Sequence, residues 1–147
     1  MAEMRRTTVS LRFHGDDLDP EEISRILGVQ PTKGVKKGGT WTTPKGKEIV
    51  AWRGYWMLSA PDESPGKLDK QVAILFAALS TDLEAWRALS LRFRGNIFVG
   101  LFLSGFNEGQ SLSPTTTCAI GLRGLVIDLD IYSGDDLDET TVRSHLL

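Results

Sequence analysis

Cysteine and histidine are scarce in this chain of 147 residues, which contains one cysteine and two histidines. A lone Cys118 excludes a disulfide within the chain and suits a reducing compartment. His14, Cys118 and His145 lie far apart, and neither a Cys-x-x-Cys nor a His-x-x-x-His spacing occurs. The sequence therefore predicts neither a metal site nor a resident cofactor.

Motifs for covalent chemistry are missing as well. No Gly-x-Ser-x-Gly motif occurs, and Cys118 lies in an apolar segment without a neighbouring base, where cysteines usually serve as small core residues. The stretch 34–40 superficially resembles a phosphate-binding loop, but Gly39 stands where that loop needs a lysine. No catalytic residue is assigned, so we expect contact with a partner rather than turnover. A cleft that gathered His14, Cys118 and a carboxylate would overturn this expectation.

An excess of basic charge and a long hydrophobic run are both absent. The net charge is −2, which argues against a nucleic-acid or anionic-membrane partner. The longest apolar stretch, 97–106, is interrupted by Gly100, Ser104 and Gly105, whereas a membrane span needs about 20 apolar residues. Because no apolar leader follows the N-terminus either, we expect a cytoplasmic protein.

What is present is an ordinary globular composition. Hydrophobic residues make up 41% of the chain and charged residues 24%, which are typical values for a folded domain. The length fits one domain over residues 1–147. Within it we expect a globular core over 7–132, followed over 133–147 by an acidic turn and a short C-terminal helix.

The first strand and the first helix carry the clearest local signals. Val9, Leu11 and Phe13 alternate with polar residues, which is the period of a strand with one buried face. Asp19 is suited to cap a helix over 20–27, since proline follows it and acidic residues fill the first turn. A glycine then occupies the position of a left-handed C-terminal cap.

The remaining elements follow from periodicity and turn residues. We expect one strand over 48–59 with a bulge at Gly54, helices over 67–89 and 114–120, and strands over 92–103 and 125–132. In the last strand the aliphatic residues should point inward and the aspartates outward. Together these elements predict an α+β two-layer sandwich: a mostly antiparallel sheet of four or five strands with helices mainly on one face. Repeated strand–helix units would also suit a ferredoxin-like layout.

An aromatic and basic segment is the most distinctive feature. Tyr55 and three of the four tryptophans fall within 41–56, and they exceed what one short strand hides on one face. Aromatic and arginine side chains dominate binding hot spots and line ligand pockets. The candidate binding surface comprises Trp41, Trp52, Arg53, Trp56, Lys36 and Lys37. The alternative is that the rings complete the core and that the lysines belong to a solvated loop.

Two aspartates form a second, weaker candidate. Asp128 and Asp130 project from the same face of the last strand, and two carboxylates there could hold a divalent cation. The alternative is a solvated outer face on which they pair with Arg12 or Arg53 of a neighbouring strand.

Several motifs in order resemble a bacterial family known as domain of unknown function 4279. They are Gly15-Asp16-Asp17-Leu18-Asp19-Pro20, Leu27-Gly28-Val29-Gln30-Pro31-Thr32, Lys37-Gly38, Trp52 to Trp56, Leu112-Ser113-Pro114 and Ile127-Asp128-Leu129-Asp130-Ile131-Tyr132. The resemblance covers roughly Val9 to Tyr132 and implies an α+β domain without assigned catalytic residues. One departure is Thr115-Thr116-Thr117 after Pro114: threonine is a poor helix former, so the helix there should be short or irregular.

Two functional hypotheses follow. The first is a non-enzymatic binding domain for a protein partner, for example an immunity-type or scaffold protein; that specific form is an analogy. The second is a small-molecule or anion-binding domain that uses the segment 41–56, with enzymatic activity left open. Exposed tryptophans would be needed for either.

Overall fold

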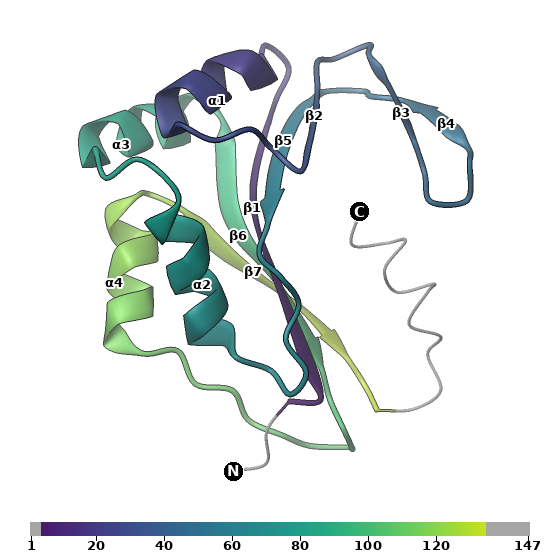
Figure 1. Cartoon of the computed structure of the whole chain (residues 1–147), viewed down its shortest axis with the longest axis vertical. Helices are drawn as coiled ribbons and strands as arrows, with labels where there is room; N and C mark the ends of the chain where they lie inside the picture. Colours follow the sequence, from purple (N-terminus) through teal and green to yellow (C-terminus); the bar gives the residue numbers. More distant parts are fainter. Residues whose placement is uncertain (1–3, 135–147) are drawn as a thin grey trace.

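A computed structural model describes residues 4–134 of the chain (Figure 1). The elements in chain order are β1 (Arg6–Gly15), α1 (Pro20–Leu27), β2 (Lys33–Val35), β3 (Thr40–Thr42), β4 (Glu48–Val50), β5 (Gly54–Ser59), α2 (Leu68–Ala77), α3 (Leu83–Arg92), β6 (Arg94–Phe102), α4 (Pro114–Leu122) and β7 (Val126–Tyr132). The C-terminal helix expected after residue 133 and His145 lie outside the described residues.

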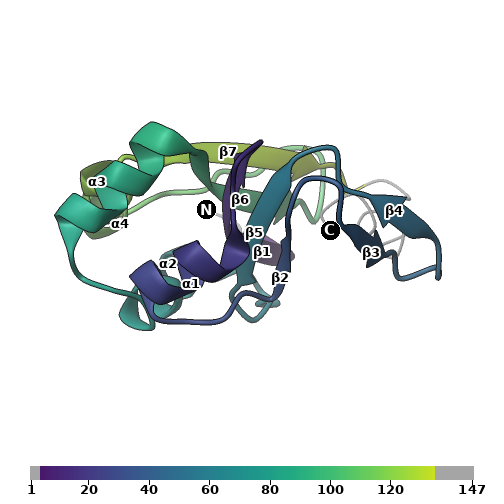
Figure 2. The same ribbon diagram turned by 90° about the horizontal axis from the view of Figure 1, so that it is seen from above.

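A five-stranded sheet in the order β2-β5-β1-β6-β7 forms one layer, and the four helices cover one of its faces (Figure 2). β1 is antiparallel to both β5 and β6, and β5 is antiparallel to β2. The predicted α+β sandwich with a mostly antiparallel sheet is therefore confirmed.

The sheet combines two interlocked strand–helix–strand units. In the first, β1–α1–β2, the two strands flank β5; in the second, β5–α2–α3–β6, the two strands flank β1. This split arrangement is the ferredoxin-like layout. β7 extends it through α4 and pairs in parallel with β6.

The first helix forms as its capping signals predict. The side chain of Asp19 accepts a hydrogen bond from the backbone N–H of Glu21, and Gly28 adopts a left-handed conformation with φ 87°. Ile23 and Leu27 on its inner face are fully buried against the sheet. The bounds 20–27 are confirmed.

Two expected elements are each divided. Residues 48–59 form β4 and β5 rather than one strand, because β4 pairs with β3 whereas β5 pairs with β1 and β2. Ala51, just after β4, still exchanges backbone hydrogen bonds with Gly38 and Gly39 on the β3 side. Gly54 is not a bulge, since β5 pairs with β1 in unbroken register from Gly15↔Gly54 onward.

The predicted helix over 67–89 is likewise two helices, α2 and α3. Asp82 caps the second helix: its carboxylate accepts from the backbone N–H groups of Glu84 and Ala85. The fourth helix, α4, is longer than its threonines suggested. Ser113 caps its N-terminus, and the hydroxyl of Thr116 is satisfied by Asp69 of α2.

The core lies between the sheet and the helices and is rich in aromatic rings. Trp56 and Trp86 are fully buried on either side of Phe13, with ring centroids 6.2 and 6.3 Å from it. The indole N–H of Trp56 donates to the Ser24 hydroxyl at 3.1 Å. Trp56 is therefore a core residue, and its place on the candidate binding surface was wrong.

β7 departs from the expected pattern of burial. Leu129 and Ile131 lie on the helix side of the sheet as predicted, beside Val99 and Leu101, but they are 52% and 60% exposed. Their half of the strand runs past the end of α4, so helix α4 does not cover it (Figure 1). Asp128 and Asp130, expected to be outermost, are only half-exposed on the opposite face of the sheet.

Candidate functional site

The sheet face opposite the helices gathers side chains that the core does not use. In β1, Leu11 and Phe13 point into the core, so the alternate residues Arg12 and His14 point to the open face. Across the pairs of β5, Tyr55 lies opposite His14 on this face. The edge strand β2 adds Lys33 by the same alternation.

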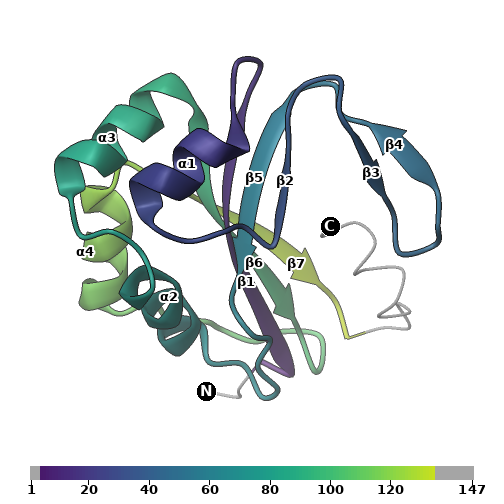
Figure 3. The ribbon, with the colours of Figure 1, turned by 45° about the horizontal axis from the view of Figure 1, so that its top comes forward.

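The β3–β4 hairpin stands apart from the main sheet and closes one side of this face (Figure 3). Trp41 pairs with Ile49 in the hairpin. The turns at its two ends use Gly38 and Gly46, both with φ 85°, a conformation that glycine adopts without strain. The connection 51–53 then returns the chain to β5.

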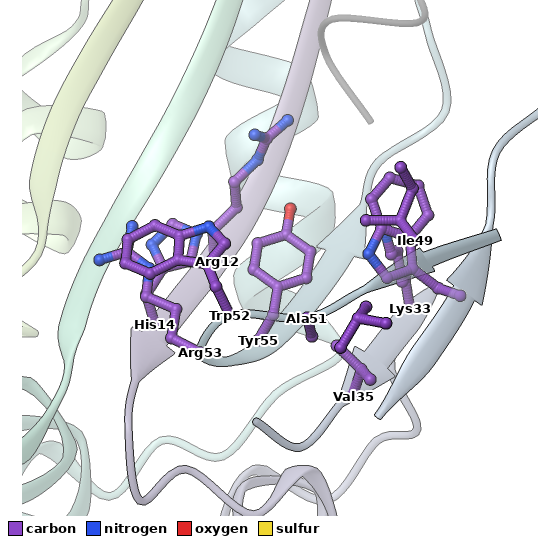
Figure 4. Close-up of a pocket in the computed structure, with 11 residues that line it drawn as sticks. Arg12, His14, Lys33, Val35, Ile49, Ala51, Trp52, Arg53 and Tyr55 are labelled. Carbon is purple, nitrogen blue, oxygen red and sulfur yellow. The ribbon is translucent and has the colours of Figure 1, made fainter. Parts of the chain in front are cut away.

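A cleft with a volume of about 280 Å³ lies between the hairpin and the open sheet face (Figure 4). Arg12, Lys33 and Arg53 are its cationic lining residues, and no acidic residue of the described chain lines it. Trp41, Trp52 and Tyr55 supply aromatic walls. The cleft is thus positively charged and lined in part by flat rings.

Ring contacts position the charged groups. His14 stacks on Tyr55 with centroids 4.9 Å apart and an interplanar angle of 18°. The Lys33 ammonium lies over the Trp41 ring and 5.4 Å from the Tyr55 centroid. On the other side, the Arg53 guanidinium lies 4.4 Å from the ring centroid of Trp52, a side chain that is 74% exposed.

Burial changes the protonation of these groups. It lowers the pKa of His14 to about 4, with smaller effects in the same direction from Arg53 and Arg12, so the imidazole is neutral at pH 7. Burial and the nearby Arg12 lower the pKa of Lys33 to about 8. The Trp41 ring beside the ammonium favours the charged form, so Lys33 is mainly cationic at neutral pH.

His14 also carries a polar atom without a hydrogen-bond partner among the described residues. Its Nδ1 is buried and makes no hydrogen bond to any of them. Burying such a nitrogen without a partner costs stability.

The shifted histidine leads to a pH prediction. The pKa of His14 is about 4 in the folded chain and about 6.5 in an unfolded chain. Between these pH values, His14 is protonated in the unfolded chain but not in the folded one. Stability should therefore fall as the pH drops from about 6.5 toward about 4. Urea denaturation at several pH values measures this loss. His14→Gln should make the slope in this window shallower, and an unchanged slope would contradict the burial of a neutral imidazole.

A second hollow of about 350 Å³ lies on the other side of Lys33 and Trp41. Thr32, Thr42 and Met57 contribute to its walls. Lys33 and Trp41 line both hollows, so their contact forms the partition between them.

The acidic pair lies outside the cleft and is partly neutralised within the chain. Asp128 is 3.2 Å from the Arg94 guanidinium and also accepts from Asn96. Asp130 accepts from the Tyr132 hydroxyl, and burial together with this contact raises the pKa of Tyr132 to about 12. No group of three or more potential metal ligands occurs among the described residues.

The other sequence candidates are dispersed. Lys36 and Lys37 flank the turn after β2, within 4.0 Å of the carboxylates of Asp19 and Asp16, and do not line the cleft. Cys118 lies exposed on α4 in the helix layer, on the opposite side of the sheet from His14. Of the residues of the predicted surface, Trp41, Trp52 and Arg53 do line the cleft.

Sequence reasoning missed Arg12, His14 and Lys33 as members of the site, and it noted Tyr55 only as part of the aromatic segment. The alternation of β1 was a usable signal, because it places Arg12 and His14 on the face opposite Leu11. Nothing local indicated that a hairpin would fold over that face.

The fold and the cleft define a two-layer α+β domain with a cationic, aromatic site on its helix-free face. The family model described as Domain of unknown function (DUF4279) matches residues 5–134, and the chain belongs to this family. No curated protein and no solved structure gave a match. Within residues 4–134, no helix is both long and apolar enough to cross a bilayer.

Proposed function

We propose that this chain is a binding domain that holds a small anionic ligand with a flat body in the cleft between the sheet and the β3–β4 hairpin. The observation that carries the proposal is the lining itself: Arg12, Lys33 and Arg53 approach one cavity beside aromatic rings, and no acidic residue of the described chain lines it. An anion entering the cleft would meet attraction from several sides.

The partly desolvated surroundings favour charge-assisted hydrogen bonds. Arg12 is partly buried: its guanidinium lies 3.9 Å from the Phe98 ring centroid, and its Nε donates to the Ser10 hydroxyl at 2.9 Å. Guanidinium and ammonium groups form charge-assisted hydrogen bonds with carboxylates. The rings of Trp41 and Tyr55 suit a flat body beside that anion. At about 280 Å³ the cleft is near the lower end of the range of about 300–1,000 Å³ for ligand pockets, so a small ligand is favoured.

Matched pairs of small molecules test this proposal. Benzoate and indole-3-acetate carry a flat ring with a carboxylate, and benzamide and indole-3-acetamide are their uncharged counterparts. Because a ligand that binds only the folded state stabilises it, the carboxylates should raise the melting temperature and the amides should not. Equal effects of acid and amide, or no shift with any anion tested, would contradict the proposal.

Charge-removing variants locate the binding. Arg12→Gln and Lys33→Gln should each weaken carboxylate binding about 10- to 100-fold, as expected for the loss of a charge-assisted hydrogen bond of about 1.5–3 kcal/mol. Lys36→Gln is the matched control, since Lys36 is exposed and outside the cleft. Affinity should also decline as the pH rises through about 8, where Lys33 loses its proton. An equal loss in all three variants would indicate nonspecific attraction.

A protein partner, of immunity or scaffold type, is the second candidate. Val50 and Trp52, 63% and 74% exposed at the hairpin side of the cleft, are side chains of the kind that anchor protein interfaces. Trp52→Ala separates the two candidates when the carboxylate titration is repeated with this variant. If a small ligand is held by Arg12 and Lys33, the variant should lose only the part of the carboxylate affinity that the Trp52 wall contributes.

A further inference from the structure

The edge of the sheet at β7, unpaired within residues 4–134, offers backbone hydrogen-bonding groups. Within residues 4–134, β7 pairs only with β6. The N–H of Leu103 donates to the carbonyl of Tyr132 at 3.0 Å, so Tyr132 belongs to the alternate residues that bond toward β6. In a parallel ladder, the residues that alternate with those bonded to β6 direct both their N–H and their C=O away from β6. Ile127, Leu129 and Ile131 therefore present their N–H and C=O groups at the edge.

The side chains of these edge residues are apolar and lie next to an apolar hollow. Leu129 and Ile131 are more than half exposed, on the helix side of the sheet. They line a hollow of about 250 Å³ together with Leu103 and Phe106, and Phe106 is 98% exposed. A strand laid along β7 would find an apolar surface beside its backbone partners.

The other face of the same strand is acidic, and this restricts the occupant. A second copy pairing antiparallel about Leu129 would set Asp128 of one chain opposite Asp130 of the other. Like charges directly opposite each other in a sheet destabilise the pair. A strand with basic residues on this face would instead complement both carboxylates, of which Asp130 bonds to Tyr132 and Asp128 to Arg94 and Asn96.

We propose that the β7 edge binds an extended segment of a different protein as a sixth strand of the sheet. The segment alternates apolar side chains, which pack over Leu129, Ile131 and Phe106, with basic side chains, which face Asp128 and Asp130. Backbone hydrogen bonds supply affinity in this mode of recognition and the alternate side chains supply specificity. The hollow beside β7 shares no lining residue with the cleft, so each proposal has its own test.

Amide exchange in the full-length chain tests this edge directly. The probe is a blocked synthetic peptide of alternating lysine and valine, added to isotope-labelled protein. The amides of Leu129 and Ile131 should exchange rapidly in the free chain and slow down when the peptide binds. Those of Asp128 and Asp130, which bond to β6, should be slow throughout.

Four controls make the outcome decisive. A peptide N-methylated on its pairing edge and a peptide of alternating glutamate and valine should both bind at least about tenfold more weakly, a difference of about 1.4 kcal/mol. Ile131→Lys should weaken the lysine–valine peptide by a similar factor without lowering the melting temperature. Ile74→Lys, at an exposed position on α2, should leave binding unchanged.

Any one of five results would overturn the proposal. They are equal binding of the N-methylated or the acidic peptide, equal binding by Ile131→Lys, the absence of saturable binding, and protection of the Leu129 and Ile131 amides before any peptide is added. The last result would mean that another segment of the chain or a second copy already covers the edge.

Discussion

Trp56→Ala should destabilise the protein by about 3–5 kcal/mol, the usual cost of removing a large buried aromatic side chain. Trp56 is fully buried between β5 and α1, and its ring meets Phe13 edge-on at 6.2 Å. The variant would also leave the Ser24 hydroxyl without the indole N–H that donates to it. Urea denaturation monitored by far-UV circular dichroism measures the change in the free energy of unfolding.

Trp52→Ala is the matched control, four residues earlier in the same segment. Its side chain is 74% exposed, so the free energy of unfolding should change by no more than about 0.5 kcal/mol. The pair of variants separates the two roles that the sequence assigned jointly to these tryptophans. Similar losses in both would place Trp52 in the core and remove it from the wall of the cleft.

Gly54→Ala should cost about 1–3 kcal/mol or more, the range for forcing extra volume into a packed site. A Cβ at this position would lie 2.7 Å from the carbonyl oxygens of Gly15 and Leu18 and 2.8 Å from the Leu18 Cβ. These atoms belong to the backbone or sit next to it, so they cannot yield by changing a rotamer. The strand β5 would have to shift relative to β1.

The same substitution tests how the cleft is built. Gly54 lies between Arg53 and Tyr55, so a shift there should also weaken carboxylate binding. Gly121→Ala is the control: nothing lies within 4 Å of its added methyl group, and alanine is the better helix former in α4, by about 1 kcal/mol. Unchanged stability in Gly54→Ala would show that the approach of β5 to the turn after β1 is looser than described.

Alternate residues of the adjacent strands β1 and β5 face the core and the cleft. Leu11, Phe13 and Trp56 fix β1 and β5 by filling the core, and the residues between them receive their orientation from the same backbone. Arg12, His14 and Tyr55 are thus held by strands that the core makes rigid. A site built on strands in this way is better ordered than one built on loops alone.

Local signals in the sequence were sufficient wherever neighbouring residues decide the structure. The cap at Asp19, the proline after it and the left-handed Gly28 define the first helix because their hydrogen bonds lie within a few residues. The same reasoning failed for 48–59, where the backbone of Ala51 bonds to Gly38 and Gly39 across the hairpin. No local pattern records such a partner.

The site was predictable only in part. The segment 41–56 correctly drew attention to Trp41, Trp52 and Arg53, which line the cleft, but composition could not separate them from the buried Trp56. Similarly, the alternation of β7 correctly placed its aliphatic residues on the helix side of the sheet, but not how far along the strand the helices cover them. Burial is a property of the neighbouring layer, and that layer comes from residues far away in the chain.

The α+β class, the first helix with its caps, and the alternation that gives β1 one face for the core and one for polar groups all follow from neighbouring residues. That the hairpin folds over the open face, that Trp56 is internal and that α4 leaves the edge of β7 uncovered follows from packing between distant parts of the chain. Caps and periodicity act over a few residues, whereas a cleft forms from strands that meet only when the chain has folded.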